Sequence, residues 1–490
     1  MLKPISAARW DYAAAAHLLN RAGFGGPPSE IEALVKLGPE QAIARLVDYA
    51  DTPDAWPRPD WAKPDPVRAE RLKQYREAPE MERRELRQAE QKEQRARAQE
   101  LVLDWLDRMA RTPRPLQEKL VLFWHGHFAT SIQKVRDPWL MFRQIELFRS
   151  QAAGRWPDLL VAVTRDPAML VWLDQAQSRK EHPNENYARE VMELFALGEG
   201  NYSEKDILET ARALTGLTYD RVAQEPQWRP RQHDATPKTV LGRTADFGPD
   251  EVIRHIANRP QSAQFIARRL WNFFAADEAP AGILGALAAE LERGGREVRP
   301  MLKKLFLAEE FYAPAVMGSQ VKAPVVWLVM AVRQLQRDLP KLPATAAALR
   351  DLGQALLAPP NVKGWDGGIS WINTASLTAR QRHATLLVLG RDGLPEMAVG
   401  GQADRLRRLA AARRQKLGTK APVDVAVLFT EAERRGPETL LPALQRRFLA
   451  MPMRSGLREE IIQALGSKPD DDAVLGAVKA VVTSTDYQLT

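Results

Sequence analysis

The sequence predicts a mainly α-helical protein, all-α in class, built as an irregular multi-helix assembly with at most one small β-hairpin. Apolar residues recur every three to four positions through nearly the whole chain, which is the period of an amphipathic helix. The stretch 219–248 is polar and contains Pro and Gly, and it is too irregular for a helix. We therefore place the hairpin there.

The chain is long enough to form several structural units. Its 490 residues exceed what one ordinary hydrophobic core serves. Changes in composition predict N-terminal helices with a Pro- and Trp-rich loop at 1–66, a charged helical hairpin at 67–112, a core helical domain at 113–390 and a C-terminal helical unit at 403–490. A linker is predicted between the last two units, at 390–402.

Local signals place the N-terminal elements. Ser29, with Glu32 three residues later, resembles a capping box and predicts a helix start, and Gly38-Pro39 predicts that this helix ends and another begins. Glu and Arg recur at three- and four-residue spacing through 67–111, which is typical of a solvated helix, here with a break near Pro79. A lid or nucleic-acid helix is the functional alternative, but the balanced charges favour a surface hairpin.

The core elements follow in order. An apolar helix is predicted at 116–128, and a second at 184–197 with Asn184 at its start. Ser203, followed by Asp206, predicts the start of a third helix. The Pro- and Gly-rich segment 359–368 is the clearest loop in the chain.

Composition limits the function classes. The hydrophobic content of 45% and charged content of 27% are those of a soluble globular protein, and the net charge of +8 is mild for this length. No nucleic-acid motif is visible, so no nucleic-acid partner is expected. The chain has no cysteine, which excludes disulfides and thiolate chemistry. No window predicts a membrane span and no secretory signal is visible, so we expect a cytoplasmic location.

Three segments place ionisable residues inside apolar runs, where burial is costly without partners or a ligand. The first contains His125 and His127 within Phe-Trp-His-Gly-His-Phe. Residues two apart point about 200° apart on a helix, so a shared metal requires a break at Gly126. The alternative is one core histidine bonded to backbone and one exposed histidine.

The second segment begins the helix at 184–197. Asn186, Glu190 and Glu193 lie at i, i+4 and i+7 and share a helical face. They are candidate ligands for a divalent cation, or a general base held by Arg189. The alternative is a self-satisfied network in which Arg189 bridges the glutamates and Asn184 caps the helix.

The third segment is His233-Asp234 with Lys238, in the irregular region where loops commonly carry site residues. Trp365, in the Gly-rich loop, is a candidate for stacking on a sugar or base, although such a side chain more often fixes its loop to the core. Arg268-Arg269 is interpreted as a pair of snorkelling side chains and not as an anion clamp.

These residues define two functional hypotheses. The first is a metal-dependent hydrolase or transferase that acts on an anionic or carbohydrate-like substrate. Its catalytic groups would be Glu190, Glu193, His233 and Asp234, its substrate-binding groups Asn186, Arg189, Lys238 and Trp365, and its metal ligands His125, His127 and Glu190. Mg²⁺, Mn²⁺ or Zn²⁺ suits such donors, and no nucleotide cofactor is expected. The second hypothesis is a non-catalytic helical binding or scaffold protein.

The chain resembles a known bacterial family, the one catalogued as domain of unknown function eighteen-hundred. The matching segments run in order through the chain: 17–25, 123–131, 165–170, 184–190, 211–216, His233-Asp234, 238–242 and 359–365. The resemblance implies a helical protein whose activity is unassigned. It also implies frequent export and a sulfatase-like partner protein.

Overall fold

The computed structural model describes residues 2–339, 343–390 and 421–490. The protein is mainly α-helical, as predicted, and its strands form two separate antiparallel pairs. Most of the predicted linker at 390–402, and residues 403–420 of the predicted C-terminal unit, lie outside the described residues.

The first half of the chain forms the N-terminal helices, the long hairpin and most of the core. Its helices are α1 Tyr12–Ala22, α2 Pro28–Val47, α3 Arg68–Glu77, α4 Glu80–Arg111, α5 Pro115–His127, α6 Ile132–Val135, α7 Pro138–Gln151, α8 Trp156–Thr164, α9 Pro167–Trp172, α10 Glu185–Glu190, the π-helix η4 Val191–Ala196 and α11 Glu204–Leu214.

The strands and the remaining helices complete the fold. They are β1 Leu217–Asp220, β2 Glu225–Trp228, β3 Lys238–Val240, β4 Arg243–Ala245, α12 Pro249–Ala257, α13 Pro260–Phe274, α14 Ile283–Arg293, α15 Val298–Leu307, α16 Pro324–Gln334, α17 Pro343–Asp351, the 3₁₀ turn η7 Gly368–Trp371, α18 Thr374–Leu389, α20 Val425–Leu428, α21 Pro437–Phe448, α22 Ser455–Leu465 and α23 Asp471–Thr483.

Several helix starts follow the sequence signals. Ser203 and Asp206 form a reciprocal capping box at α11, and the Asn184 side chain accepts from the Asn186 backbone N–H, so both predictions are confirmed. The backbone of Gly38 leaves helical geometry at φ 74°, and this break before Pro39 was also predicted. The predicted cap at Ser29 is wrong: α2 begins at Pro28, because a proline at the first helical position needs no partner for an N–H it lacks.

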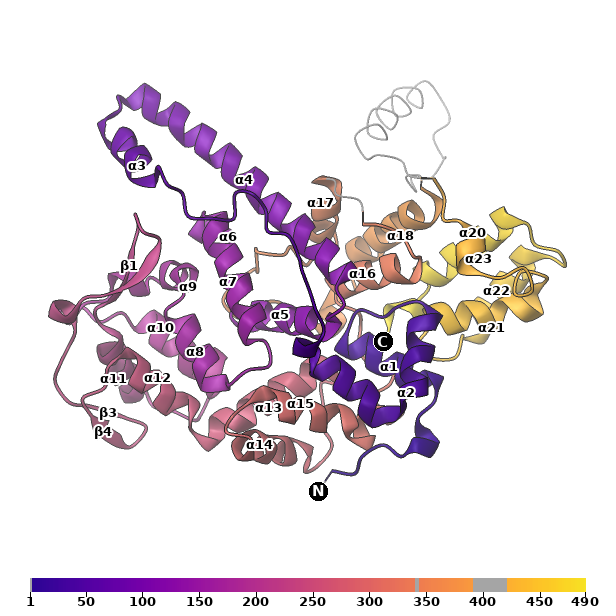
Figure 1. Cartoon of the computed structure of the whole chain (residues 1–490), viewed down its shortest axis with the longest axis horizontal. Helices are drawn as coiled ribbons and strands as arrows, with labels where there is room; N and C mark the ends of the chain where they lie inside the picture. The colour runs from indigo at the N-terminus through magenta and orange to yellow at the C-terminus, as the bar shows by residue number, and fades with distance from the viewer. Residues whose placement is uncertain (1, 340–342, 391–420) are drawn as a thin grey trace.

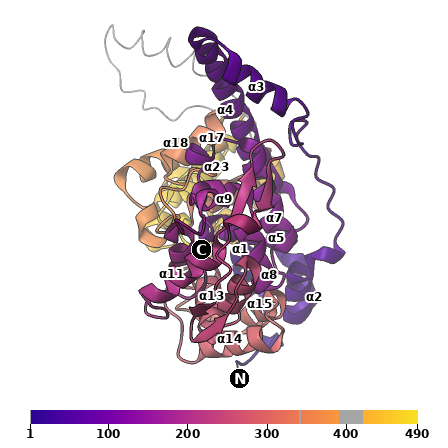
Figure 2. The ribbon, with the colours of Figure 1, turned by 90° about the vertical axis from the view of Figure 1, so that its left-hand side faces the viewer.

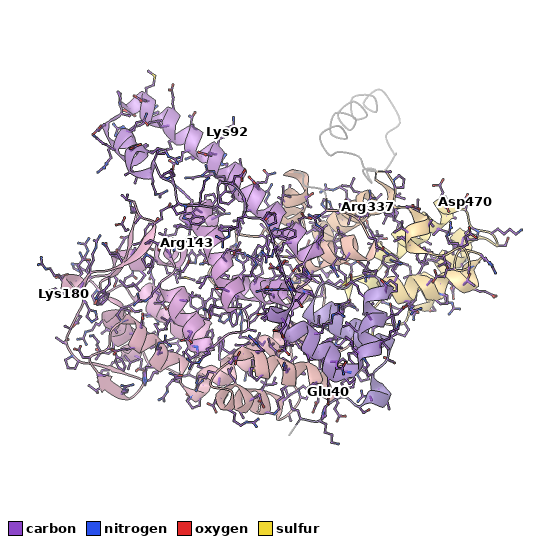
Figure 3. The ribbon with its side chains drawn as sticks, viewed as in Figure 1. Glu40, Lys92, Arg143, Lys180, Arg337 and Asp470 are labelled. Atoms are coloured by element: carbon purple, nitrogen blue, oxygen red, sulfur yellow. The ribbon has the colours of Figure 1, made fainter. Side chains whose placement is uncertain are left out.

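The charged segment forms a projecting arm. Helices α3 and α4 are separated at Ala78–Pro79, which confirms the predicted break, and the pair extends away from the body (Figures 1 and 2). The outer part of α4 is exposed and carries charged side chains such as Lys92, whereas its last turns bury Trp105, Leu106 and Met109 (Figure 3). This long helix is therefore anchored at one end and solvated at the other.

The buried apolar side chains form one contiguous cluster that runs from Ile5 to Tyr487. All four predicted units contribute to it, and their boundaries stay a prediction. An aromatic group at its centre joins α5 to its neighbours, with Trp124 stacked on Trp156 and Phe128 stacked on Phe148. Within the described ranges, no helix is both long and apolar enough to cross a membrane.

Candidate functional site

A cavity of about 490 Å³ lies where segments far apart in the sequence meet. Its walls come from the end of α1, from α5, the second half of α13, the segment leading into α16 and the Gly-rich loop. Thr490 also lines it. A cavity of this size accommodates a small molecule.

Four cationic side chains line this cavity: Arg21, Lys119, Arg269 and Lys322. Three of them are almost completely buried, with exposed fractions of 2% for Arg21, 4% for Lys119 and 2% for Lys322. The neighbouring Arg268 is exposed, whereas Arg269 is half-buried.

Main-chain oxygen atoms receive three of these cations. Arg21 donates to Ala275 O at 2.9 Å, to Val316 O at 2.9 Å and to Thr490 O at 2.6 Å. Lys119 donates to Gly23 O at 2.8 Å. Lys322 donates to Tyr487 O at 2.7 Å and lies 3.5 Å from the centroid of that ring. Within the described residues no Asp or Glu side chain forms an ion pair with any of the four cations, and Asp277 acts on Arg21 only from a longer distance.

The pKa values show the electrostatic consequence of this burial. Desolvation, with a smaller contribution from Arg21, lowers the pKa of Lys119 to about 7. Desolvation also lowers the pKa of Lys322 well below its usual value, with Arg380 adding to the effect, and it lowers the pKa of Arg269. The pKa of Arg21 falls to about 9 for the same reason, and Asp277 partly opposes that fall. An anion in the cavity would reverse these effects.

Several buried polar atoms around the cavity have no hydrogen-bond partner in the described part of the chain. They are Arg21 Nε, Arg269 Nε, Asn272 Oδ1, His127 Nδ1 and Thr490 Oγ1. Buried polar atoms are seldom left unsatisfied in native proteins. Their concentration around one cavity is what a site for a polar ligand would show.

The Gly-rich loop closes one side of the cavity against α5. A Cβ atom on Gly364 would lie 2.5 Å from Gly126 O, and Gly364 has φ +83°, so only glycine fits this approach. Trp365, which follows Gly364, lines the cavity, and its ring centroid lies 5.7 Å from that of His125. The histidine motif and the loop motif are therefore in direct contact, because both backbones approach closely at a glycine.

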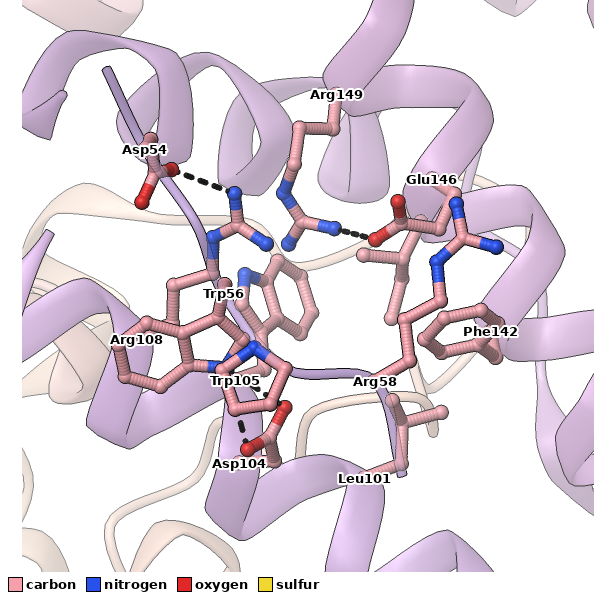
Figure 4. A pocket seen from close by; sticks show the side chains of 12 residues that line it. Asp54, Trp56, Arg58, Leu101, Asp104, Trp105, Arg108, Phe142, Glu146 and Arg149 are labelled. Carbon is pink, nitrogen blue, oxygen red and sulfur yellow. Dashed lines mark hydrogen bonds and ion pairs between the residues drawn. The ribbon is translucent and has the colours of Figure 1, made fainter. Parts of the chain in front are cut away.

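A second polar pocket, of about 180 Å³, provides a contrast (Figure 4). It lies between α4, α7 and the loop that carries Trp56, and two of its arginines, Arg108 and Arg149, are paired with acidic side chains. Arg108 donates to Asp54 at 2.7 Å, and Arg149 donates to the fully buried Glu118 at 2.6 Å. Such self-paired charges serve the fold and leave little for a ligand. We therefore place the candidate functional site in the larger cavity.

The structure places the predicted histidine pair as follows. Both side chains are buried, and α5 continues through Gly126 without a break. His125 Nε2 accepts from the Leu357 N–H at 3.1 Å, and His127 Nε2 donates to Phe195 O in the π-helix at 2.9 Å. Desolvation lowers both pKa values, that of His125 to about 4, so both rings are neutral near pH 7. His127 lines the cavity, and His125 lies behind Trp365.

The residues of the second motif lie outside the cavity lining. Arg189 pairs with Glu185 at 3.3 Å and with Glu204 at 2.8 Å, and it thereby links α10 to α11. Burial and the nearby Glu193 raise the pKa of Glu190, and Lys363 opposes this. Tyr202 OH lies 3.4 Å from Glu193, and the side chain of Asn186 points from an exposed position at the start of α10.

The third motif belongs to the region of the strands, which also lies away from the cavity lining. His233 Nδ1 lies 2.9 Å from Thr215 O, and Arg212 donates to Asp234 at 2.7 Å. Hydrogen bonds from Arg212 and Thr236 hold the pKa of Asp234 well below its usual value despite its desolvation. Lys238 is fully buried and donates to Phe247 O at 3.1 Å.

Of the predicted site residues, the structure thus brings His127 and Trp365 to the cavity. In residues 2–339, 343–390 and 421–490, no group of three or more His, Cys, Asp or Glu side chains is arranged to hold a metal ion. The predicted ligand set of His125, His127 and Glu190 stays a prediction.

Sequence reasoning missed the cations. Arg21 lies in an Ala- and Leu-rich helix, Lys119 in the apolar run of α5, and Lys322 next to the apolar start of α16. One sequence signal could have indicated them. Each is a single cation inside an apolar run, with no acidic residue three or four positions away to pair with it.

Fold and site together define a helical protein with a cavity that four cationic side chains line. A family model described as "Protein of unknown function (DUF1800)" matches residues 17–489, and the chain belongs to that family. No curated protein and no solved structure matches the chain.

Proposed function

We propose that this protein is an enzyme, a hydrolase or transferase, that recognises an anionic small-molecule substrate in the cavity between α1, α5 and α13. The observation that carries the proposal is the convergence of Arg21, Lys119, Arg269 and Lys322 on one cavity, where no Asp or Glu side chain of the described residues forms an ion pair with any of them. Burying cations in this way is costly, and an anionic ligand offsets that cost.

His127 supports the enzymatic part of the proposal. Its Nε2–H is committed to Phe195 O, so the Nδ1 atom carries the lone pair and lacks a partner within the described chain. Burial and the Arg269 charge lower the pKa of His127, and a bound anion that offsets both would raise it towards the range that general-base chemistry needs. In this scheme His127 accepts a proton from water or from a substrate hydroxyl while the cations hold the anionic group.

Anion binding is tested by thermal unfolding of the full chain with citrate, sulfate or phosphate, against chloride at matched ionic strength. A ligand that binds the native state stabilises it by about 2.7 kcal/mol at a hundred times its Kd. We expect stabilisation of the wild type and its loss in Arg269→Gln and Lys119→Met, with Arg268→Gln as the matched exposed control. If anions stabilise wild type and Arg269→Gln equally, or stabilise neither, the result would favour the second hypothesis, a non-catalytic binding or scaffold protein.

Metal dependence, which the sequence hypothesis includes, has a separate test. Elemental analysis of the purified protein measures Mg, Mn and Zn per chain. Stoichiometric metal in the wild type that is lost in a His125→Ala/Glu190→Ala double variant would support the predicted ligand set. Metal that persists in the double variant would exclude it.

A further inference from the structure

The cationic and acidic side chains of the cavity differ in how exposed they are. Three of its cations are buried and Arg269 is half-buried, whereas the two Asp side chains that line it, Asp277 and Asp366, are exposed. A ligand therefore meets these carboxylates at the exposed mouth of the cavity and most of the positive charge on its buried walls. Because carboxylates repel a second negative charge and accept hydrogen bonds from hydroxyls, the mouth suits a neutral hydroxylated group.

Among the cavity's cations, Arg269 has the most hydrogen-bonding capacity available. The terminal nitrogens of Arg21 are already engaged by carbonyl oxygens, and each lysine uses one of its three N–H donors. No hydrogen bond or ion pair joins the Arg269 side chain to another described residue, and its Nε is buried. A guanidinium with an unoccupied fork matches the two oxygens of a carboxylate.

The rest of the lining combines aromatic rings with amides and hydroxyls. The aromatic side chains are Phe123, Phe273, Trp365 and Trp371. The neutral polar side chains are Asn20, Asn272, Ser319, Gln320, Gln354 and Thr490. Rings cover the apolar face of a sugar, and planar amides bond its hydroxyls. A volume of about 490 Å³ holds one or two sugar rings.

From these features we propose that the substrate is a carboxylated sugar of the hexuronate type, whose carboxylate pairs with Arg269 and whose hydroxyls face Asp277 and Asp366 at the mouth. The ring lies against Trp365. This inference rests on the proposed function and narrows it to one ligand class.

Isothermal titration of the full chain tests the inference with a matched set of probes. They are glucuronate, galacturonate and digalacturonate, with glucose and galactose as neutral analogues, cyclohexanecarboxylate as a carboxylate without hydroxyls, and glucose 6-phosphate. We expect at least one uronate to bind, with its neutral analogue weaker by roughly a hundredfold because buried cations are then left unpaired. Cyclohexanecarboxylate should bind about tenfold more weakly than the uronate, since it leaves the amides unbonded.

Two protein variants complete the test. Arg269→Lys retains charge but loses the fork, and we expect about a tenfold loss of uronate affinity, whereas Arg268→Lys should have no effect. Equal binding of cyclohexanecarboxylate, tighter binding of glucose 6-phosphate, or no uronate binding while citrate still binds would each overturn the sugar-acid inference alone. Failure of every anion, citrate and sulfate included, would instead overturn the proposed function.

Discussion

At the residue scale, the unusual feature is the lysine in the middle of α5. Lys119 is 4% exposed and lies 5.0 Å from the Phe24 ring centroid, with only a backbone carbonyl as a hydrogen-bond partner among the described residues. Its stabilising contacts are weaker than those of a paired cation, so the empty protein bears the cost of desolvating it. In the proposed function, binding of an anion near Lys119 offsets this cost.

This cost predicts the direction of a pH effect. The pKa of Lys119 is about 7 in the folded protein and about 10.5 when unfolded, so between these values the unfolded state binds more protons. Stability attributable to this group is therefore lowest below pH 7 and rises as the pH increases towards 10.5. Between pH 7 and 9.5 we expect the unfolding free energy of the wild type to gain about 3 kcal/mol relative to Lys119→Met. Urea unfolding of both proteins at both pH values measures this difference, and parallel curves would contradict it.

At the element scale, contact between α5 and the Gly-rich loop positions Trp365. Gly364→Ala should displace the loop, because a Cβ would lie 2.5 Å from Gly126 O and the backbone has φ +83°. We expect a loss of about 2–4 kcal/mol and weaker anion binding. Gly282→Ala, outside the cavity lining, is the matched control: it has φ +81° and ψ −14° but nothing within 4 Å of the added Cβ, so only the backbone cost of about 1–2 kcal/mol applies. Urea unfolding and anion titration distinguish the two, and identical effects would show that the close approach is unimportant.

The helix that carries the second motif provides another prediction. Arg189 spans Glu185 and Glu204, and all three side chains are more than one-third exposed. Exposed ion pairs contribute less than about 1 kcal/mol, so Arg189→Gln should lower stability by no more than that. Because Arg189 lies outside the cavity lining, we also expect unchanged anion affinity. A substantial loss of affinity would instead support the substrate-binding role that the sequence predicted for this residue.

The elements also show what sequence could and could not provide. Apolar periodicity predicted the helical class, and local capping chemistry placed the starts of α10 and α11, because both depend on residues close together in the chain. The π-helix at Val191–Ala196 changes the helical phase after Glu190, and no local pattern indicated it. The predicted shared face of Asn186, Glu190 and Glu193 assumed an unbroken α-helix. The cationic cavity depends on contacts such as Arg21 with Thr490, which no local pattern reveals.

At the scale of the whole molecule, the cavity joins the two ends of the described chain. Arg21 in α1 donates to Thr490 O, and Lys322 donates to Tyr487 O, while α5 and α13 supply the other walls. These segments belong to one contiguous apolar core. A ligand in the cavity therefore contacts elements whose separation requires disruption of the core as a whole.

This arrangement predicts which segments a bound anion protects from hydrogen exchange. Hydrogen exchange of the full chain, with and without a saturating anion, should show slower exchange in α1, α5, α13 and residues 486–490 together, because opening any one of them exposes the bound anion. The outer half of α4, which is exposed and remote from the cavity lining, should exchange at the same rate in both states. Arg269→Gln should remove the protection from all four segments at once, whereas Arg268→Gln should leave it intact. Protection confined to a single segment, or equal protection along α4, would show that the anion binds elsewhere and that the buried cations serve only the fold.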